Sequence, residues 1–77
     1  MLIDVRAHIE AEGDNRVTDL HVWAVGPAIF AAEIALITSQ PHPPEHYRAL
    51  LPRSLRLVHT TFEIRHCLEH PESRPRA

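Results

Sequence analysis

The chain has 77 residues, of which 44% are hydrophobic and 23% charged, and its formal net charge is −2. This length fits one small domain whose core is marginal without help from a metal, a disulfide or a partner chain. The charge balance argues against nucleic acid as a partner, the single cysteine excludes an internal disulfide, and no apolar run approaches the ~20 residues of a membrane span.

The first predicted element is a short helix at the start of the chain. Leu2, Ile3, Val5 and Ile9 recur at helical spacing and form an apolar stripe. Gly13 supplies the stop, because glycine commonly ends a helix in the left-handed conformation.

Two strands are predicted next, from residue 16 to about residue 25 and from residue 29 to about residue 38. Gly26-Pro27 between them suits a tight hairpin turn. The second strand is apolar except for Glu33, which indicates a strand covered on both faces, by helices on one side and by something else on the other. Glu33 must therefore face the open side, pair with an arginine or join a site, and we favour the pairing.

The first strand has two chemically different faces. With a period of two, its apolar residues point one way, while Asp19, His21 and Trp23 point the other. One side of the strand is thus an ordinary core face, and the other carries a carboxylate, an imidazole and the only tryptophan.

A second helix is predicted from Pro44 to about residue 51, because proline suits the first helical turn, and this helix buries Tyr47. The third strand is predicted over residues 57–67. Its apolar face begins with Val58, and its other face carries His59, Thr61, Glu63, Arg65 and Cys67.

These elements predict an α+β fold of order αββαβ, a ferredoxin-like two-layer sandwich in which two helices cover one face of a three-stranded sheet. The third strand runs parallel to one of the other two. Residues 1–67 form the domain, and residues 68–77 are expected to be a flexible tail. The sheet face without helices should support a homodimer, with Trp23, Glu33 and His59 at the interface.

Five segments together resemble a known family. They are Thr18-Asp19-Leu20-His21-Val22-Trp23, Gly26-Pro27, the apolar strand after it, Pro43-Pro44-Glu45-His46-Tyr47-Arg48 and Val58-His59-Thr60-Thr61-Phe62-Glu63-Ile64. In order and spacing these segments resemble the C-terminal cytoplasmic domain of cation diffusion facilitator (cation efflux) transporters, closest to the branch associated with cobalt and nickel efflux.

The resemblance implies a metallochaperone-like domain that forms a V-shaped homodimer beneath the membrane part, on its cytoplasmic side, with divalent metal at the interface. His21 and Trp23 match the family's His-x-Trp. Glu63 occupies a third-strand position where some members place a metal ligand, and His46 lies near a ligand position in the second helix. The family's transmembrane helices are absent from this sequence, which leaves open a transporter domain or a free-standing relative.

Arg65 departs from the family pattern, because it stands where several relatives place a ligand and a guanidinium cannot bind a cation. Either the site has moved to His66 and Cys67, or this chain binds metal differently. The candidate ligands are therefore His21, His46, Glu63, His66 and Cys67. Such mixed ligands fit zinc, cobalt, nickel or copper.

Three functions follow as hypotheses. The first is a metal-sensing dimerisation domain of a divalent cation efflux transporter or a free-standing relative. The alternatives are a soluble metal carrier, or a structural dimerisation module whose histidines are incidental. The sequence contains no CxxC motif, phosphate-binding glycine loop or nucleophile elbow, so we do not expect an enzyme.

Overall fold

The computed structural model describes residues 1–67, and the tail predicted for residues 68–77 lies outside them. The elements are, in chain order, α1 (Leu2–Glu10), β1 (Arg16–Gly26), β2 (Ile29–Thr38), α2 (Pro44–Arg48), the 3-10 helix η1 (Arg53–Leu55) and β3 (Leu57–His66). The sheet order is β1-β2-β3, with β1 antiparallel and β3 parallel to β2.

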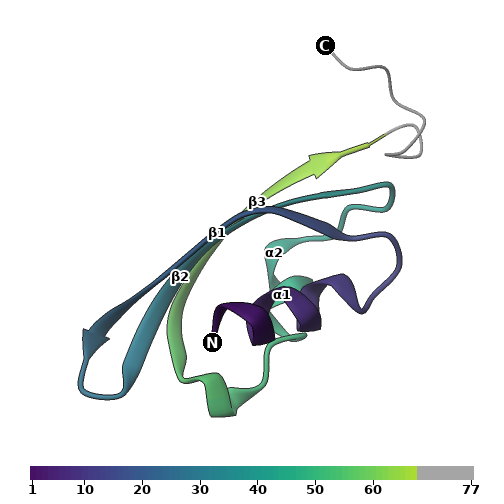
Figure 1. Cartoon of the computed structure of the whole chain (residues 1–77). Coiled ribbons are helices and arrows are strands. Elements are labelled where there is room, and N and C mark those ends of the chain that lie inside the picture. Colours follow the sequence, from purple (N-terminus) through teal and green to yellow (C-terminus); the bar gives the residue numbers. More distant parts are fainter. Residues whose placement is uncertain (68–77) are drawn as a thin grey trace.

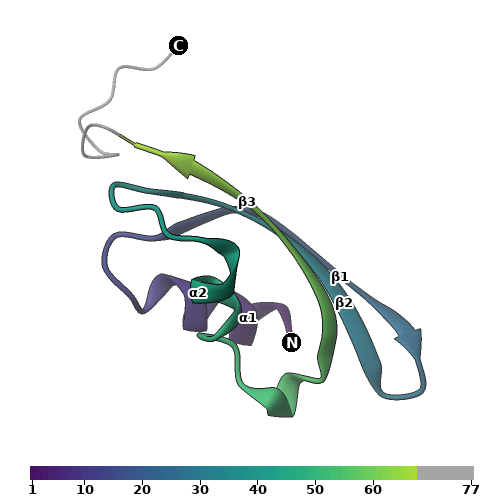
Figure 2. The same ribbon diagram turned by 180° about the vertical axis from the view of Figure 1, so that it is seen from behind.

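The sheet is curved, and both α-helices lie against its concave side (Figure 1). Figure 2 shows the same two layers from behind. The predicted α+β fold of order αββαβ, with two helices on one face of a three-stranded sheet, is confirmed.

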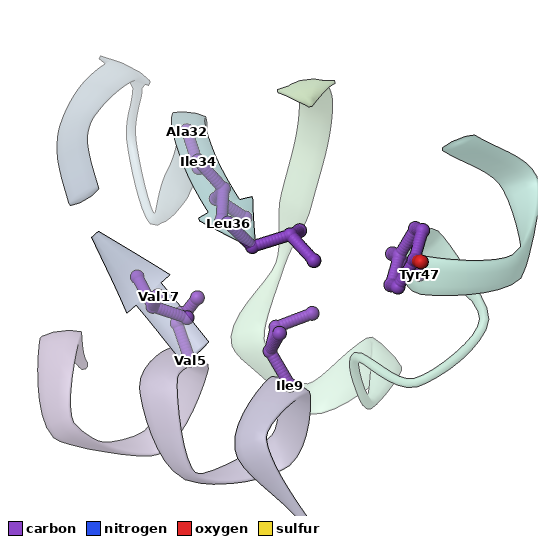
Figure 3. Close-up of a cluster of buried hydrophobic side chains, with 7 residues drawn as sticks. All are labelled: Val5, Ile9, Val17, Ala32, Ile34, Leu36 and Tyr47. Carbon is purple, nitrogen blue, oxygen red and sulfur yellow. The ribbon is translucent and has the colours of Figure 1, made fainter. Parts of the chain in front are cut away.

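The core lies between the helices and the concave side of the sheet. Each element except η1 and β3 contributes fully buried apolar side chains to it, and Figure 3 shows the cluster: Val5, Ile9, Val17, Ala32, Ile34, Leu36 and Tyr47. Tyr47 is completely buried, and its hydroxyl accepts a hydrogen bond from the backbone N–H of His42 at 3.0 Å. That bond satisfies the only polar atom of the side chain, as burial of a hydroxyl requires.

Side chains of α1 cover the edge of β1 where a bulge interrupts its pairing. The Val17 N–H donates to Glu10 Oε2 at 2.8 Å, and the Val17 carbonyl accepts from the Arg6 guanidinium at 3.0 Å. An edge strand otherwise presents unpaired backbone groups to other chains. Glu10 and Arg6 therefore fix α1 to the sheet and protect this part of the edge.

The hairpin and the second helix differ in detail from the prediction. Gly26 is the last residue of β1, and Ala28, with φ of 59°, takes the left-handed position of the turn. A Cβ at Gly26 would lie 2.9 Å from Cδ1 of Ile29, so a larger residue there would require the Ile29 side chain to shift. The second helix stops at Arg48 because Leu50 N–H bonds to the Tyr47 carbonyl, three residues back, instead of continuing the α-helical pattern.

Two of the predicted apolar faces included side chains that the structure leaves exposed. Leu2 and Ile3 are exposed, because only Val5 and Ile9 of α1 point into the core. Val58 is 61% exposed, since the pairing of β3 with β2 is irregular there and Val58 faces no β2 partner.

Two isoleucines of the same helix give a matched test of this core. Replacing the buried Ile9 by Ala should lower the free energy of unfolding by about 2–5 kcal/mol, because the change leaves a cavity. The same change at Ile3, which is 82% exposed, should alter it by no more than about 0.5 kcal/mol. Urea denaturation followed by circular dichroism measures both, and equal losses would contradict the assigned orientation of α1.

Candidate functional site

The convex side of the sheet is uncovered by any helix of residues 1–67 (Figure 1). We call it the outer face. The register and the alternation of side chains place these residues on it: Arg16, Asp19, His21, Trp23, Ala31, Glu33, Ala35, Ile37, His59, Thr61, Glu63 and Arg65.

Three acidic residues from three different strands meet in the middle of the outer face. His21 is paired with Glu33, and in the neighbouring row Asp19 is paired with Ala35, whose partner on the other side is Glu63. A hollow of about 170 Å³ lies over this point, and Asp19, Glu33, Ala35 and Glu63 are among the residues that line it. Directly opposed residues have Cβ atoms only about 5 Å apart. The carboxylates of one chain thus share a small, exposed region.

Two of these carboxylates have a partner of opposite charge or a hydrogen-bond donor nearby. His21 Nε2 lies 3.1 Å from Asp19 Oδ2, and both side chains are more than half exposed. Arg65 Nε donates to Glu63 Oε2 at 3.3 Å. Glu33 makes no ion pair within residues 1–67. The pairing with an arginine that the sequence favoured is therefore not found among these residues.

Trp23 and His59 flank the small side chain of Ala31 in one row across the sheet. Ala31 is buried, whereas Trp23 is 44% exposed and His59 is exposed. Tryptophan combines a large apolar area with low conformational freedom, which suits the centre of a protein interface. This row gives the outer face an apolar part next to its acidic part.

His46 lies on the opposite side of the sheet from His21, because α2 packs on the concave side (Figure 2). Its Nε2 is 2.7 Å from Glu12 Oε2, and its ring stacks on that of His42 with centroids 4.1 Å apart. The hydrogen bond from His46 lowers the pKa of Glu12 below its ordinary value. In one chain His46 therefore binds Glu12 and cannot share an ion with the outer face.

His66 and Cys67 do not converge on one point either. β3 remains paired through His66, which lies opposite the inward-facing Thr38, and His66 Nε2 is 3.1 Å from the Ser39 carbonyl oxygen. Cys67 is only 1% exposed, and its N–H extends the pairing to the Thr38 carbonyl at 2.8 Å. Because the pairing continues to Cys67, and adjacent strand residues point to opposite faces, the two side chains do not meet at one ion.

No three His, Cys, Asp or Glu side chains within residues 1–67 are arranged to hold a metal ion. The outer face brings together His21, Asp19, Glu33 and Glu63 only as a loose set on a convex surface. Nitrogen and carboxylate oxygen are suitable donors for first-row transition metals. The arrangement in one chain is therefore at most part of a metal site.

The sequence prediction missed two residues of these clusters. Asp19 was placed on the same face as His21 but was not counted among the ligands, although the two-residue spacing already put it beside His21. Glu12 was missed because it lies 34 residues before His46, and nothing local in the sequence indicates that contact.

No helix in the described part of the chain is long and apolar enough to cross a membrane. Comparison with protein-family models, with curated proteins and with solved structures finds no match to this chain.

The Glu12–His46 pair predicts a specific dependence of stability on pH. Because the folded-state pKa of Glu12 is lowered, its carboxylate stabilises the fold above its ordinary pKa of 4.5, and this contribution is lost as the pH falls through the lower folded-state value. Glu12→Gln should therefore be less stable than the parent chain near neutral pH, and the difference should vanish in acid. Urea denaturation between about pH 3 and about pH 7 measures it.

Glu45→Gln is the matched control, because Glu45 is an exposed residue of α2 whose carboxylate forms no ion pair within residues 1–67. If both variants follow the same curve over the whole pH range, the Glu12–His46 contact does not contribute to stability.

Proposed function

We propose that this domain is a homodimerisation module that responds to a divalent transition-metal ion, as the regulatory domain of a cation efflux transporter or as a free-standing relative of one. One observation carries the proposal. The outer face has no covering element within residues 1–67, and on it Trp23 lies next to a group of ligand-capable side chains from all three strands. The resemblance to the cation efflux family supplies the link to transport.

The charges of the outer face make dimerisation and metal binding depend on each other. A twofold contact through this face brings Asp19, Glu33 and Glu63 of one chain close to the same residues of a second copy. Like charges at short range repel, and removal of water strengthens the repulsion. A divalent cation between the two copies offsets that repulsion, and it completes a ligand set that one chain only begins.

The mechanism is linkage between metal binding and association. An ion bound by ligands from both copies binds the dimer better than the monomer, so it shifts the equilibrium by that difference in affinity. His21 supplies a nitrogen ligand, and Asp19, Glu33 and Glu63 supply oxygens. Zinc, cobalt, nickel and copper all accept such donors. Because the ligands must lose protons, binding should weaken as the pH falls through the histidine range.

The soluble metal carrier is the less favoured alternative. A carrier needs a compact and accessible ligand group within one chain in order to pass its ion on. Here the candidate ligands are spread over strands, His46 is hydrogen-bonded to Glu12, and Cys67 is buried. The distribution favours an ion shared between copies over an ion carried by one.

Titration with Zn²⁺, Co²⁺ or Ni²⁺ should convert the chain from monomer to dimer. His21→Ala should weaken metal binding by at least about tenfold, because loss of one ligand costs more than about 1.4 kcal/mol of binding free energy. Calorimetry measures the metal affinity and sedimentation velocity measures the oligomeric state. His8→Ala is the control, because His8 is an exposed histidine of α1 on the other layer.

The outcomes separate the hypotheses. Metal binding without dimerisation would favour the carrier. Dimerisation unaffected by metal or chelator would favour the purely structural module. Equal losses in His21→Ala and His8→Ala would contradict the outer face as the metal site.

Trp23→Ala tests the interface independently of the ligands. Truncation of a tryptophan at an interface centre typically costs about 2 kcal/mol or more of association free energy, which raises the dimer dissociation constant about thirtyfold. Because Trp23 faces away from the core, the free energy of unfolding of the monomer should change little. An unchanged dimer affinity would show that association uses another surface.

A further inference from the structure

A second surface feature lies away from the outer face, where α2, η1 and the start of β3 meet. It is a pocket of about 620 Å³, and no outer-face residue lines it. Its volume is in the usual range for small-molecule sites. Leu51, Leu57 and Ile29 are among its apolar lining residues.

Three arginines line this pocket, and no carboxylate does. Arg48, Arg53 and Arg56 form no ion pair within residues 1–67, where every Asp or Glu that is ion-paired binds another cation. The whole chain has a net charge of −2, so this group is a local concentration of positive charge against the overall sign. A guanidinium is a planar fork of donors that matches the oxygens of a phosphate.

Two of the arginines are held in place by neighbouring groups. Arg48 Nε donates to Thr60 Oγ1 at 2.8 Å, and its guanidinium carbon lies 5.9 Å from the centre of the Phe62 ring. Arg56 Nε donates to the Ala28 carbonyl at 3.0 Å. The remaining guanidinium N–H groups of Arg56, and all of those of Arg53, make no hydrogen bond to residues 1–67.

The backbone around this pocket is strained at two residues. Arg56 has φ of 56° and ψ of 39°, and Ala28 has φ of 59°, a conformation that residues other than glycine rarely adopt. The two strained residues belong to one unit, because Arg56 binds the Ala28 carbonyl and the Phe30 N–H donates to the Arg56 carbonyl at 2.9 Å. Arg56 is the C-cap of η1 and Ala28 lies in the hairpin turn, so these linked turns fix the backbone position of Arg56 beside the pocket. Glycine would suit position 56 better, yet arginine stands there.

We propose that this pocket binds a phosphomonoester or diphosphate group. Arg48, Arg53 and Arg56 hold the phosphate oxygens, and the apolar lining receives the less polar part of the molecule that carries the group. The pocket lies on the helix side of β3, so it does not compete with the outer face. The phosphate belongs either to a soluble molecule or to a lipid headgroup, and both present the same anion.

The test uses the complete 77-residue chain without added metal. Inorganic pyrophosphate is titrated into the ¹⁵N-labelled protein, and binding should shift the amide signals of η1 and the start of β3 in a saturable way. Arg53→Gln should weaken binding about tenfold, as expected for loss of a charge-assisted hydrogen bond. Arg16→Gln is the matched control, because this exposed arginine begins β1 opposite Ile37, at the far end of β2 from Ile29. Its affinity should stay within about twofold of the parent value.

Arg56→Gly separates binding from folding. Glycine adopts the left-handed conformation without strain, which offsets the loss of the Arg56 bond to the Ala28 carbonyl. The urea midpoint should therefore change little, while the affinity for pyrophosphate should fall as in Arg53→Gln. A variant that keeps both its stability and its full affinity would overturn the role of Arg56 and with it the proposal.

Vesicles identify the source of the phosphate. Sedimentation with phosphatidylcholine vesicles containing phosphatidate, but not with phosphatidylcholine alone, supports a lipid headgroup if Arg53→Gln abolishes it. Binding of pyrophosphate without vesicle binding supports a soluble ligand. No saturable binding of either probe, or equal losses in Arg53→Gln and Arg16→Gln, would overturn the proposal.

Discussion

β2 is apolar along almost its whole length, but the described chain has only one layer of helices to cover it. α1 and α2 bury Ala32, Ile34 and Leu36 on the concave side. On the other side the chain has nothing to add within residues 1–67, and a domain this small has few ways to enlarge its core. The outer face is therefore left without a covering layer in residues 1–67.

The outer face is intermediate in character between core and solvated surface. Ala31 is buried and Ile37 is half-buried, whereas Glu33 between them is exposed. A permanently buried interface would exclude an unpaired carboxylate at its centre, because desolvation of a charge is costly. A face exposed only to solvent would not be expected to carry the large apolar side chain of Trp23. The dimer proposed above, in which a cation offsets the charge, is consistent with both features.

The strands and their faces were predictable because side chains alternate along a strand with a period of two, which depends only on neighbouring residues. Asp19, His21 and Trp23 therefore share a face. The sequence did not predict features that depend on contacts between distant segments. The bond from His46 to Glu12 spans 34 residues. Cys67 is buried by its position after the strand, which alternation alone put on the outer face. The composition, in which every basic residue is arginine, gave no sign that three of them would gather around one pocket.

β3 connects the two surfaces that carry the proposals. Its outward residues include His59, Thr61 and Glu63, while Thr60 and Phe62, which alternate with them, contact Arg48 on the helix side. In the two proposals made above, alternation along this one strand places the second copy on one side and the anion on the other. Because the two sets of residues do not overlap, a second copy on the outer face leaves the arginine pocket open. Both can be occupied at once, and a substitution on one side of β3 need not disturb binding on the other.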